Sequence, residues 1–530
     1  MSEQRVEHAE RSEAVGSLRK DLRWLLWVIV ASGALGANYI YRTSIEFNGV
    51  RYFVLWDDAM ISMQYAKNFV EGHGLVWSAG GDIVQGFTNL GVTLMMSVVH
   101  LFPIEPEMTS AVVQAINLVA LLSLVVVCHQ LSSWGLENNR ASRLLAATMV
   151  AFCFPLHVMS LQGSDTGFIG LWLIGCHLIY VRTVAQNRGD IPWLLFTMLA
   201  IGPVLRMDSL LYVVPLLLGT MRLPGATLPR LVLGALPTGA VVAGVLAFGF
   251  FYYGDPLPNT FYLKATGQPR DLMLQKGFEQ LQSWFPYWLP AFAFAGVASV
   301  RHWKRPGVQQ WIVCIALAVA YHVWVGSDLQ PAYGSRFLVP VLPFLLVLAA
   351  EGAVIVLRPI PLRRSWVRQC VAAGICAMVL LISNSPTTNR EMWSNSTKTL
   401  LKIYAQRNIA SAVFFREHTD PSTVIALHWA GLISYFADRP VKDVLGKSDR
   451  HIARMSVDVF SPGHSKWDWD YVVETMQPDI VARQSRGLTQ LPKFRENYLL
   501  VKTKICPQFY IRRDRMDLVR YAKARFEPIP

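Results

Sequence analysis

One stretch of the chain, residues 52–77, reads YFVLWDDAMISMQYAKNFVEGHGLVW. It sets two adjacent carboxylates, Asp57 and Asp58, just past the first apolar window of the chain, residues 24–41. Charged side chains are costly near lipid, and those that occur at membrane depth commonly serve substrates or ions. The pair therefore belongs either to an ordinary solvated loop or to a reaction at the membrane surface.

The composition around this stretch indicates a polytopic membrane protein. Of 530 residues, 53% are hydrophobic and only 16% are charged, with a mean hydropathy of +0.32. Together with 17 Trp and 26 Phe, this balance is typical of a chain that crosses a bilayer several times. The seven cysteines are scattered without a CxxC pair, so we expect no disulfide framework.

Apolar windows predict where the chain enters the membrane, although several are shorter than the roughly 20 residues that cross comfortably. The windows are residues 24–41, 87–104, 109–132, 144–161, 167–182, 192–205, 209–221, 231–252, 285–300, 309–325, 337–357 and 369–383. The tail before the first window holds five cations, Arg5, Arg11, Arg19, Lys20 and Arg23. They predict a cytoplasmic N-terminus and an uncleaved anchor.

Clusters of Arg and Lys recur at every second turn of the chain, as the positive-inside rule predicts for cytoplasmic loops. They are Arg140 and Arg143; Arg182 and Arg188; Arg222 and Arg230; Arg301, Lys304 and Arg305; and Arg358, Arg363, Arg364 and Arg368. The segments between them should face outward, namely 162–167, 206–208, 253–284 and 326–336, with a first loop at about 42–86 and the tail after about 385.

This alternation holds only if one of the windows 87–104 and 109–132 fails to cross fully, or if both form one broken crossing. Irregular backbone is tolerated at membrane depth where protein shields it or where it lines a cavity. We therefore expect a polytopic α-helical membrane protein with about 11 crossings plus a re-entrant or broken segment, covering residues 1–385.

The same alternation gathers ionisable residues of both signs on the outer face. They are Asp57, Asp58, Asp165, Arg206, Asp208, Lys264, Asp328 and Arg336. Each has an ordinary explanation when taken singly: Arg206 and Asp208 can form a local ion pair, and Lys264 can snorkel to the interface. Their convergence on one face favours a functional site.

The tail, residues 386–530, reads as an extracytoplasmic α/β domain. Residues 422–427, 478–483 and 497–505 are short β-rich runs, and 428–436 has a helical pattern. The tail holds 23 Lys and Arg against 15 Asp and Glu, a net +8 of the chain's +13. This charge either attracts anionic headgroups or acidic polymers, or serves solubility alone.

A substrate linked to a lipid phosphate suits carboxylates that face a cluster of cations at a membrane. A buried Asp can accept the proton of an attacking hydroxyl, while Lys or Arg stabilises the departing phosphate. No His, Cys or Asp cluster has metal-ligand spacing, so we expect no metal and no cofactor; a metal that bridges carboxylate and phosphate stays open.

Several stretches resemble C-type glycosyltransferases, in particular the family of the terminal β-(1→2)-arabinofuranosyltransferase of mycobacterial cell-wall arabinan. The first is WDDAMISMQYAKNFVEGHGLVWSAGGDIVQGFTN, which is similar to the first extracytoplasmic loop of that family. The others are NTFYLKATG (259–267), GSRFLVPVLP (334–343), GLISYFADRPVKDVLGKSDRHIAR (431–454) and PGHSKWDWDYV (462–472). Two positions depart from the family pattern: Gln85 and Asp165 stand where relatives carry Glu.

The resemblance implies a polyprenyl-phosphate sugar donor, an aspartate base in the first loop, and transfer on the extracytoplasmic face of a bacterial plasma membrane. The base maps onto the Asp57–Asp58 pair, and Lys264 and Arg336, with Arg206 third, are the candidates for binding the donor phosphate. The remaining candidates for contact with substrate are Asp165, Asp208, Asp328, His73, His464 and Lys466. The expected partners are the lipid-linked donor, a polysaccharide or exported-protein acceptor, and the bilayer, without nucleic acid.

Two other functions stay open on the sequence. A transporter of lipid-linked sugars would also have many spans, although the chain shows no pair of similarly interrupted halves of the kind that inverted repeats produce. The same transferase chemistry could instead use mannose, or glycosylate an exported protein such as pilin.

Overall fold

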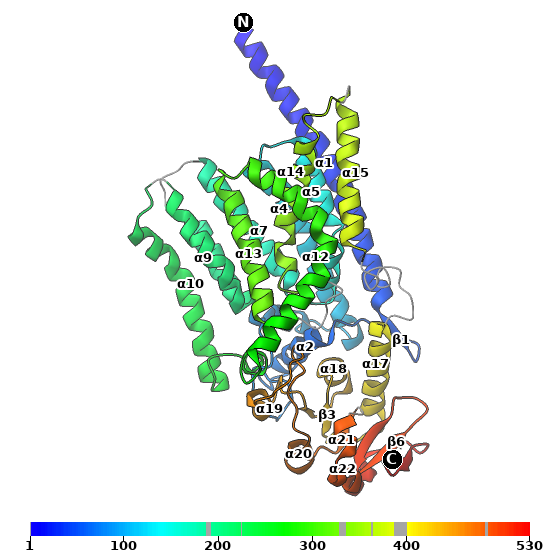
Figure 1. Ribbon diagram of the computed structural model, residues 1–530. Coiled ribbons are helices and arrows are strands. Elements are labelled where there is room, and N and C mark those ends of the chain that lie inside the picture. The colour runs from blue at the N-terminus through cyan, green and yellow to red at the C-terminus, as the bar shows by residue number, and fades with distance from the viewer. Residues whose placement is uncertain are drawn as a thin grey trace.

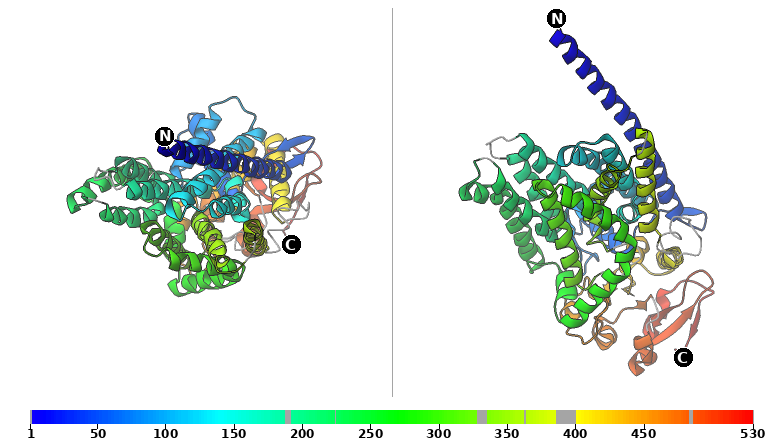
Figure 2. Two further views of the ribbon diagram at one scale, coloured as in Figure 1. Left: turned by 90° about the horizontal axis from the view of Figure 1, so that it is seen from above. Right: turned by 45° about the horizontal axis from the view of Figure 1, so that its top comes forward.

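The computed structural model of the chain describes residues 2–186, 192–223, 225–327, 335–361, 364–385, 400–482 and 486–529. Long helices form a bundle, and a smaller sheet-containing tail lies beyond the bundle at the end opposite the N-terminus (Figure 1). The right view of Figure 2 places the tail at the same end of the bundle.

The helices of the bundle match the apolar windows closely. They are α1 (Ser2–Thr43), α3 (Leu90–His100), α4 (Pro106–Gly135), α5 (Arg140–Ala151), α6 (Phe154–Leu161), α7 (Thr166–Gln186), α8 (Trp193–Leu205), α9 (Leu210–Gly219), α10 (Leu228–Phe248), α12 (Arg270–Arg301), α13 (Pro306–Trp324), α14 (Leu342–Val356) and α15 (Ser365–Ser383). Within the described residues, 7 helices are long and apolar enough to cross a membrane, or up to 8 with the bent pair α5–α6.

The expected broken segments have clear locations. Helix α3 has 11 residues, about 16 Å at 1.5 Å per residue, which is roughly half of a 30 Å hydrocarbon core. Helix α4 has 30 residues and is long enough to cross. Of the windows 87–104 and 109–132, the first is therefore the one too short to cross fully. A second interruption, a 44° bend, lies between α5 and α6.

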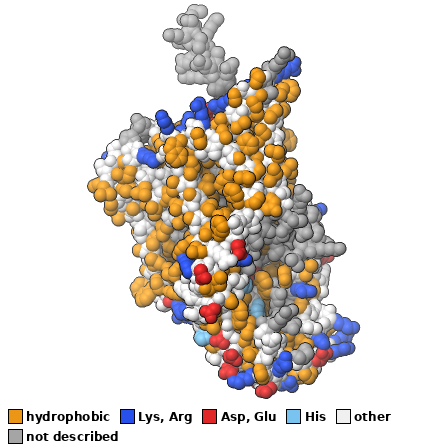
Figure 3. Space-filling view, in the orientation of Figure 1, with side chains coloured by type: hydrophobic (Ala, Val, Ile, Leu, Met, Phe, Trp, Pro, Cys, Tyr) orange, Lys and Arg blue, Asp and Glu red, His pale blue; other side chains and the backbone are white. Residues whose placement is uncertain are grey.

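The basic loops gather at the end of the bundle that carries the N-terminus. Asp21 of α1 pairs with Arg140 and Arg143, and Glu137 pairs with Arg358 at 2.6 Å and Arg301 at 3.5 Å. In the space-filling view, Lys and Arg side chains line the top edge above a broad hydrophobic band, and charges of both signs cover the tail (Figure 3). These ion pairs bring the loops around residues 140, 301 and 358 together at one end, as predicted, while Arg188 and Arg363 lie outside the described residues.

A short hairpin, followed by an amphipathic helix, lies at the other end of the bundle. Strands β1 (Ile45–Phe47) and β2 (Val50–Tyr52) pair antiparallel through the turn Asn48–Gly49, whose φ angles of 50° and 78° are those that a two-residue hairpin favours. Helix α2 (Asp57–Val70) follows, with most of its residues buried. The chain thus places the two carboxylates at the first turn of a helix packed into protein.

The tail is an α/β unit, as predicted from its short apolar runs. Its six strands lie in the order β4-β3-β5-β7-β6-β8, with β3 parallel to β4 and β5 and the remaining pairs antiparallel. The strands are β3 (Ile425–Leu427), β4 (Val441–Asp443), β5 (Ile480–Val481), β6 (Tyr498–Lys502), β7 (Phe509–Arg512) and β8 (Arg525–Glu527). The helices are α17 (Leu400–His418), α18 (Leu432–Ala437), α19 (Arg450–Arg454), α20 (Trp469–Tyr471), α21 (Arg486–Gln490) and α22 (Pro492–Asn497).

The tail shares a hydrophobic core with the first loop. One buried cluster contains Tyr65 and Trp77 from the loop together with Phe415 and Phe436 from the tail. The Trp77 indole also donates to the Ala430 carbonyl at 3.0 Å. The sequence boundary expected near 385 lies at the edge of residues 386–399, outside the described residues, and the packing joins the segments on its two sides.

We expect the basic end to face the cytoplasm and the tail to face outward. Six of the seven cysteines are buried and Cys370 is exposed, so a Cys370→Ser background suits thiol labelling in intact cells. Lys304→Cys should react with a membrane-permeant maleimide but not with an impermeant one, and Asp470→Cys should react with both. Impermeant labelling at 304, or its absence at 470, would contradict this orientation.

Candidate active site

Asp57 lies at the first turn of α2 and turns its carboxylate toward the tail. Its Oδ1 accepts from the backbone N–H groups of Gly431 and Leu432, both at 3.1 Å. Its Oδ2 is buried and has no hydrogen-bond partner among the described residues. Burial raises the pKa of Asp57 to about 6, against the opposing effect of Lys447. One oxygen is thus fixed while the other can accept a proton near neutral pH.

Asp58 turns toward cations. Lys447 donates to its Oδ1 at 2.5 Å, and Arg336 donates to its Oδ2 at 3.3 Å. Partial burial opposes ionisation, but Lys447, Arg336 and Lys264 hold the pKa of Asp58 well below its usual range. The side chain remains 46% exposed while that of Lys447 is 8% exposed, so this ion pair opens toward solvent from one side.

The start of α2 is pressed between the bundle and the tail. On the bundle side, the Trp56 N–H donates to the Gln162 carbonyl at 3.1 Å. Gly163 has a φ of +84°, and a side chain there would collide with Leu55 and Ala59. On the tail side, a Cβ at Gly431 would lie 2.0 Å from the Asp57 carbonyl oxygen. The glycine is therefore required for the approach that puts its N–H on the carboxylate.

Backbone and side-chain ties fix the loop that carries Lys447. The Asp443 carboxylate accepts from the N–H groups of Leu445 and Ser448. From the bundle side, the Asn259 amide donates to the carbonyls of Gly446, Lys447 and Asp449 at 2.9 to 3.2 Å. Because these contacts restrain the loop, the ammonium group needs little reorganisation to reach Asp58.

Arg206 forms a second charged group beside the first. Its guanidinium donates to both oxygens of Asp208, at 2.9 and 2.5 Å, and to Asp165 at 3.5 Å. The Phe337 ring lies 5.4 Å from Arg206 and 6.0 Å from Arg336, so the two guanidinium groups share one aromatic neighbour. The charge of Arg206 is compensated, and this favours a positioning role for it and for its two carboxylates.

Lys264 and His464 also lie near Asp58. Lys264 ends the helix α11 (Asn259–Ala265), and its Cε lies 3.2 Å from where a Cβ of Gly463 would stand. Burial and the nearby Lys447 lower the pKa of His464, whose Nδ1 lies 3.1 Å from the Pro462 carbonyl. The structure thus brings together the predicted residues Asp57, Asp58, Lys264, Arg336 and His464, with the Arg206 group adjoining them.

Two predicted residues lie elsewhere. Lys466 is fully buried, and its Nζ donates to the carbonyls of Tyr262, Thr266 and Ala453, which assigns it to tying α11 to the tail. His73 is exposed just past the far end of α2, about 20 Å from Asp57 at 1.5 Å per residue.

A third predicted residue, Asp328, lies outside the described residues. Among the described residues, no group of three or more His, Cys, Asp or Glu is arranged to hold a metal ion. The absence of a metal or cofactor stays a prediction.

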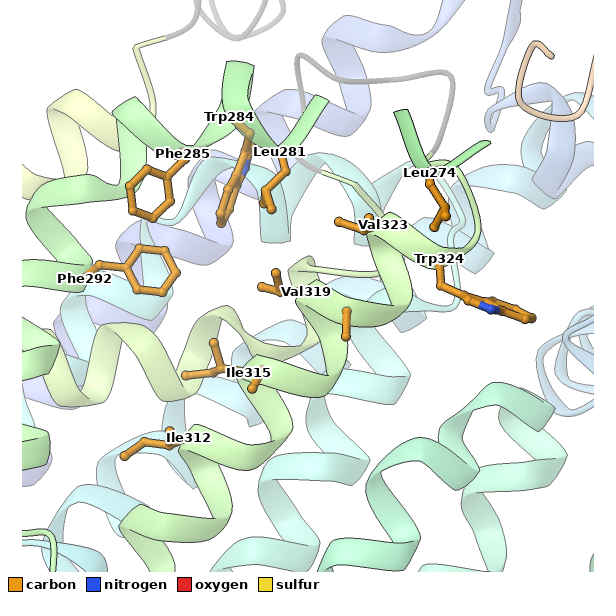
Figure 4. A pocket seen from close by; sticks show the side chains of 12 residues that line it. Leu274, Leu281, Trp284, Phe285, Phe292, Ile312, Ile315, Val319, Val323 and Trp324 are labelled. Carbon is orange, nitrogen blue, oxygen red and sulfur yellow. The ribbon is translucent and has the colours of Figure 1, made fainter. Parts of the chain in front are cut away.

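An apolar groove between α12 and α13 runs from the membrane band toward the charged groups. It has a volume of about 740 Å³, and its walls are apolar side chains from both helices (Figure 4). At one end Arg270 lies 4.2 Å above the ring of Trp324. Close by, Tyr321 contacts Phe337, the neighbour of Arg336, with ring centroids 5.2 Å apart. The rings of Tyr321 and Phe337 therefore connect this end of the groove to Arg336.

Two residues of the site were absent from the sequence-based candidates, Gly431 and Lys447. Both lie within the stretch GLISYFADRPVKDVLGKSDRHIAR that resembles the transferase family. The Gly at the start of a helical pattern and the Gly-Lys-Ser turn were the available signals. Neither signal predicts which distant carboxylate the residue contacts.

Comparisons with known proteins identify the fold. The apo oligosaccharyltransferase of Archaeoglobus fulgidus has a TM-score of 0.56 and 10% identity, over 95% of this chain and 76% of that one. ArnT from Cupriavidus metallidurans in the apo state has a TM-score of 0.56 and 13% identity, over 92% and 98%. ArnT bound to undecaprenyl phosphate scores 0.54, with 13% identity over 92% and 97%. The chain has the GT-C fold.

Comparisons of sequence identify less about this chain than comparisons of structure. A domain of unknown function, DUF8728, matches residues 400–521 of the tail. Among curated proteins, none matches this sequence. The GT-C fold and the seven or more apolar spans make the chain a multi-pass membrane protein.

The contact at Gly431 yields a direct test of the site's architecture. In Gly431→Ala, the added Cβ must displace backbone, and overpacking of this kind typically costs about 1–3 kcal/mol. We expect a lower thermal midpoint and loss of whatever activity depends on Asp57. Gly374→Ala is the matched control, since a Cβ there meets nothing within 4 Å and Ala favours the helix. Equal behaviour of the two variants would contradict the assignment of Gly431.

Proposed function

We propose that this protein is a glycosyltransferase that moves a sugar, specifically arabinofuranose, from a polyprenyl-phosphate donor to a hydroxyl group of a cell-envelope polysaccharide. Transfer takes place on the extracytoplasmic face of a bacterial plasma membrane. The observation that carries the proposal is the division of roles in the Asp57–Asp58 pair: one carboxylate is basic enough to take a proton, and the other is bound by cations.

The reaction needs a base for the acceptor, and Asp57 fits it best. The acceptor oxygen attacks the anomeric carbon while its proton passes to Oδ2 of Asp57, the buried oxygen without a partner among the described residues. A general base works best when its pKa lies near the operating pH, and Asp57 has a pKa of about 6. Asp58, with its low pKa, stays ionised and holds Lys447 and Arg336 in place.

The leaving group needs cations and a place for its lipid. As the bond between the anomeric carbon and the phosphate oxygen breaks, the bonding electrons stay on the phosphate. Arg336 and Lys264 lie where they can offset that charge. The isoprenoid chain would occupy the apolar groove of α12 and α13, whose end at Trp324 is connected to Arg336 through the rings of Tyr321 and Phe337. The likeness to an ArnT structure that holds undecaprenyl phosphate supports a donor of this class.

The transferase proposal is tested with purified protein in nanodiscs, radiolabelled polyprenyl-phospho-arabinose and an arabinan acceptor. Polyprenyl-phospho-mannose and an exported-protein acceptor serve as comparison substrates. Transfer of arabinose to the polysaccharide supports the proposal, transfer of mannose or modification of protein replaces its substrate, and no transfer from either donor overturns it.

Removing the base should abolish most turnover without preventing donor binding. Because a general base typically contributes about 10²–10⁴-fold, Asp57→Asn should lower kcat by that range and Asp58→Asn by less. Wild-type turnover should fall as the pH drops through about 6, where Asp57 becomes protonated, and stay level above it. Rate–pH profiles test both statements. A larger loss in Asp58→Asn would exchange the two roles.

Removing a phosphate partner should act on the donor. Arg336→Gln should raise the donor KM and lower kcat, roughly tenfold or more together, while the thermal midpoint changes little. Arg336→Lys should recover part of the loss because it keeps the charge without the guanidinium fork. Arg520→Gln, which breaks a surface pair with Asp420, is the matched control and should leave both constants unchanged. Unchanged donor kinetics in Arg336→Gln would assign Arg336 a structural role.

A further inference from the structure

Two groups of three aromatic rings lie in the tail, and they adjoin each other at the chain neighbours His428 and Trp429. Tyr404 stacks on Trp429 with centroids 5.7 Å apart, and Trp429 lies 6.1 Å from His464. His428, the chain neighbour of Trp429, contacts Trp469 at 5.2 Å. Trp467 stacks with Trp469 at 6.4 Å and an interplanar angle of 26°. These residues form what we call the aromatic strip: Tyr404, Trp429, His464, His428, Trp469 and Trp467.

One end of the aromatic strip adjoins the catalytic pair. Trp429 precedes by two residues the glycine whose N–H binds Asp57. His464 lies near Asp58, Lys447 and Lys264, which act on its charge. Trp467 follows His464 by three residues, at most roughly 11 Å of extended chain. Both groups of rings therefore lie within reach of a short chain molecule that extends from the reacting carboxylates.

The other end of the strip exposes an indole that its neighbours hold in place. Trp467 is 41% exposed. The residue before it, Lys466, is fully buried and donates to three carbonyls, and the residue after it, Asp468, caps Tyr471 and contacts His451 at 2.9 Å. Trp469, two residues further on, packs against a buried cluster of the tail, and Trp467 does not belong to that cluster. A Trp ring that its neighbours hold in place offers contact area to a ligand at a low cost in conformational entropy.

The charges beside the strip favour a saccharide over lipid. Asp468 and Asp470 flank Trp469, and anionic headgroups would repel them. The strip also belongs to the tail, which lies beyond the hydrophobic band of the bundle (Figure 3). Aromatic faces carry partial negative charge and attract the C–H groups on one side of a sugar ring, while carboxylates and imidazoles at the edge accept and donate to its hydroxyl groups.

We propose that the aromatic strip binds the saccharide chain of the acceptor, with Trp467 as the contact farthest from the transferred sugar. The inference rests on the proposed transferase function, since it takes the acceptor to be a glycan. It adds that the protein recognises several sugar units beyond the reacting one, so that longer acceptors bind more tightly than short ones.

Equilibrium binding without donor separates this inference from the chemistry. The full chain in nanodiscs is titrated with linear arabinofuranosyl disaccharide and hexasaccharide, with a mannosyl hexasaccharide alongside, and binding is followed by calorimetry. We expect the arabinofuranosyl hexasaccharide to bind more tightly than its disaccharide. An aromatic contact is worth about 0.5–1.5 kcal/mol, so Trp467→Ala should weaken hexasaccharide binding by roughly 2- to 13-fold and leave the disaccharide unchanged.

Two further variants keep the test decisive. Trp467→Phe retains a flat ring and should keep most of the affinity, and Trp303→Ala removes an indole that is 55% exposed at the basic end and should change nothing. Equal affinity for the disaccharide and the hexasaccharide, or an equal loss of hexasaccharide affinity in Trp303→Ala, would overturn the proposal. If hexasaccharide binding depends on Trp467 but the protein turns over no donor, the proposal for the aromatic strip is supported and the proposed transferase function is wrong.

Discussion

The site depends on one buried contact, the binding of the Asp57 carboxylate by the backbone N–H groups of Gly431 and Leu432. A buried carboxylate without donors would cost several kcal/mol, and the donors come from a segment 374 residues away in the sequence. The tail must therefore dock on the first loop before the carboxylate is tolerated at this position. The shared hydrophobic core around Tyr65, Trp77 and Phe436 supplies the favourable free energy of that docking. Tail and loop consequently form one structural unit around the pair.

The bilayer constrains the charges at both ends of the bundle. At the end that carries the N-terminus, Asp21 and Glu137 are covered by arginines from several loops, which fixes where the helices end. The buried Glu351 of α14 is tolerated there because His302 lies 3.1 Å from it. At the opposite end the charges converge on a small region instead. Charges at the end that carries the N-terminus are compensated within the loops. At the opposite end, Asp58 and Arg336 remain partly exposed, so that a substrate can reach them.

Much of this arrangement could be predicted from the sequence because it follows from local patterns. Apolar windows matched the helices, and short β-rich runs in the tail predicted β3, β5 and β6. The alternation of basic loops required one segment that does not cross fully, and α3 is the segment too short to do so. Side-chain partners could not be predicted in this way, since no local pattern encodes contacts between distant segments. Lys447 was missed for that reason. Lys466 was a candidate for contact with substrate, but three carbonyls hold it inside the protein.

Because Asp57 and Asp58 are adjacent, the site can hold one carboxylate that accepts a proton and another that binds cations. Successive residues of an α-helix point about 100° apart, so the two carboxylates must face different surroundings. Cations suited to a phosphate would also stabilise the ionised form of any base beside them and weaken it as a proton acceptor. Asp58 binds Lys447 and Arg336 directly, and so compensates much of their charge. Asp57, one residue away and more deeply enclosed, keeps a pKa of about 6. Two adjacent carboxylates thus allow a basic carboxylate and a pair of bound cations to exist side by side, which a single carboxylate could not do.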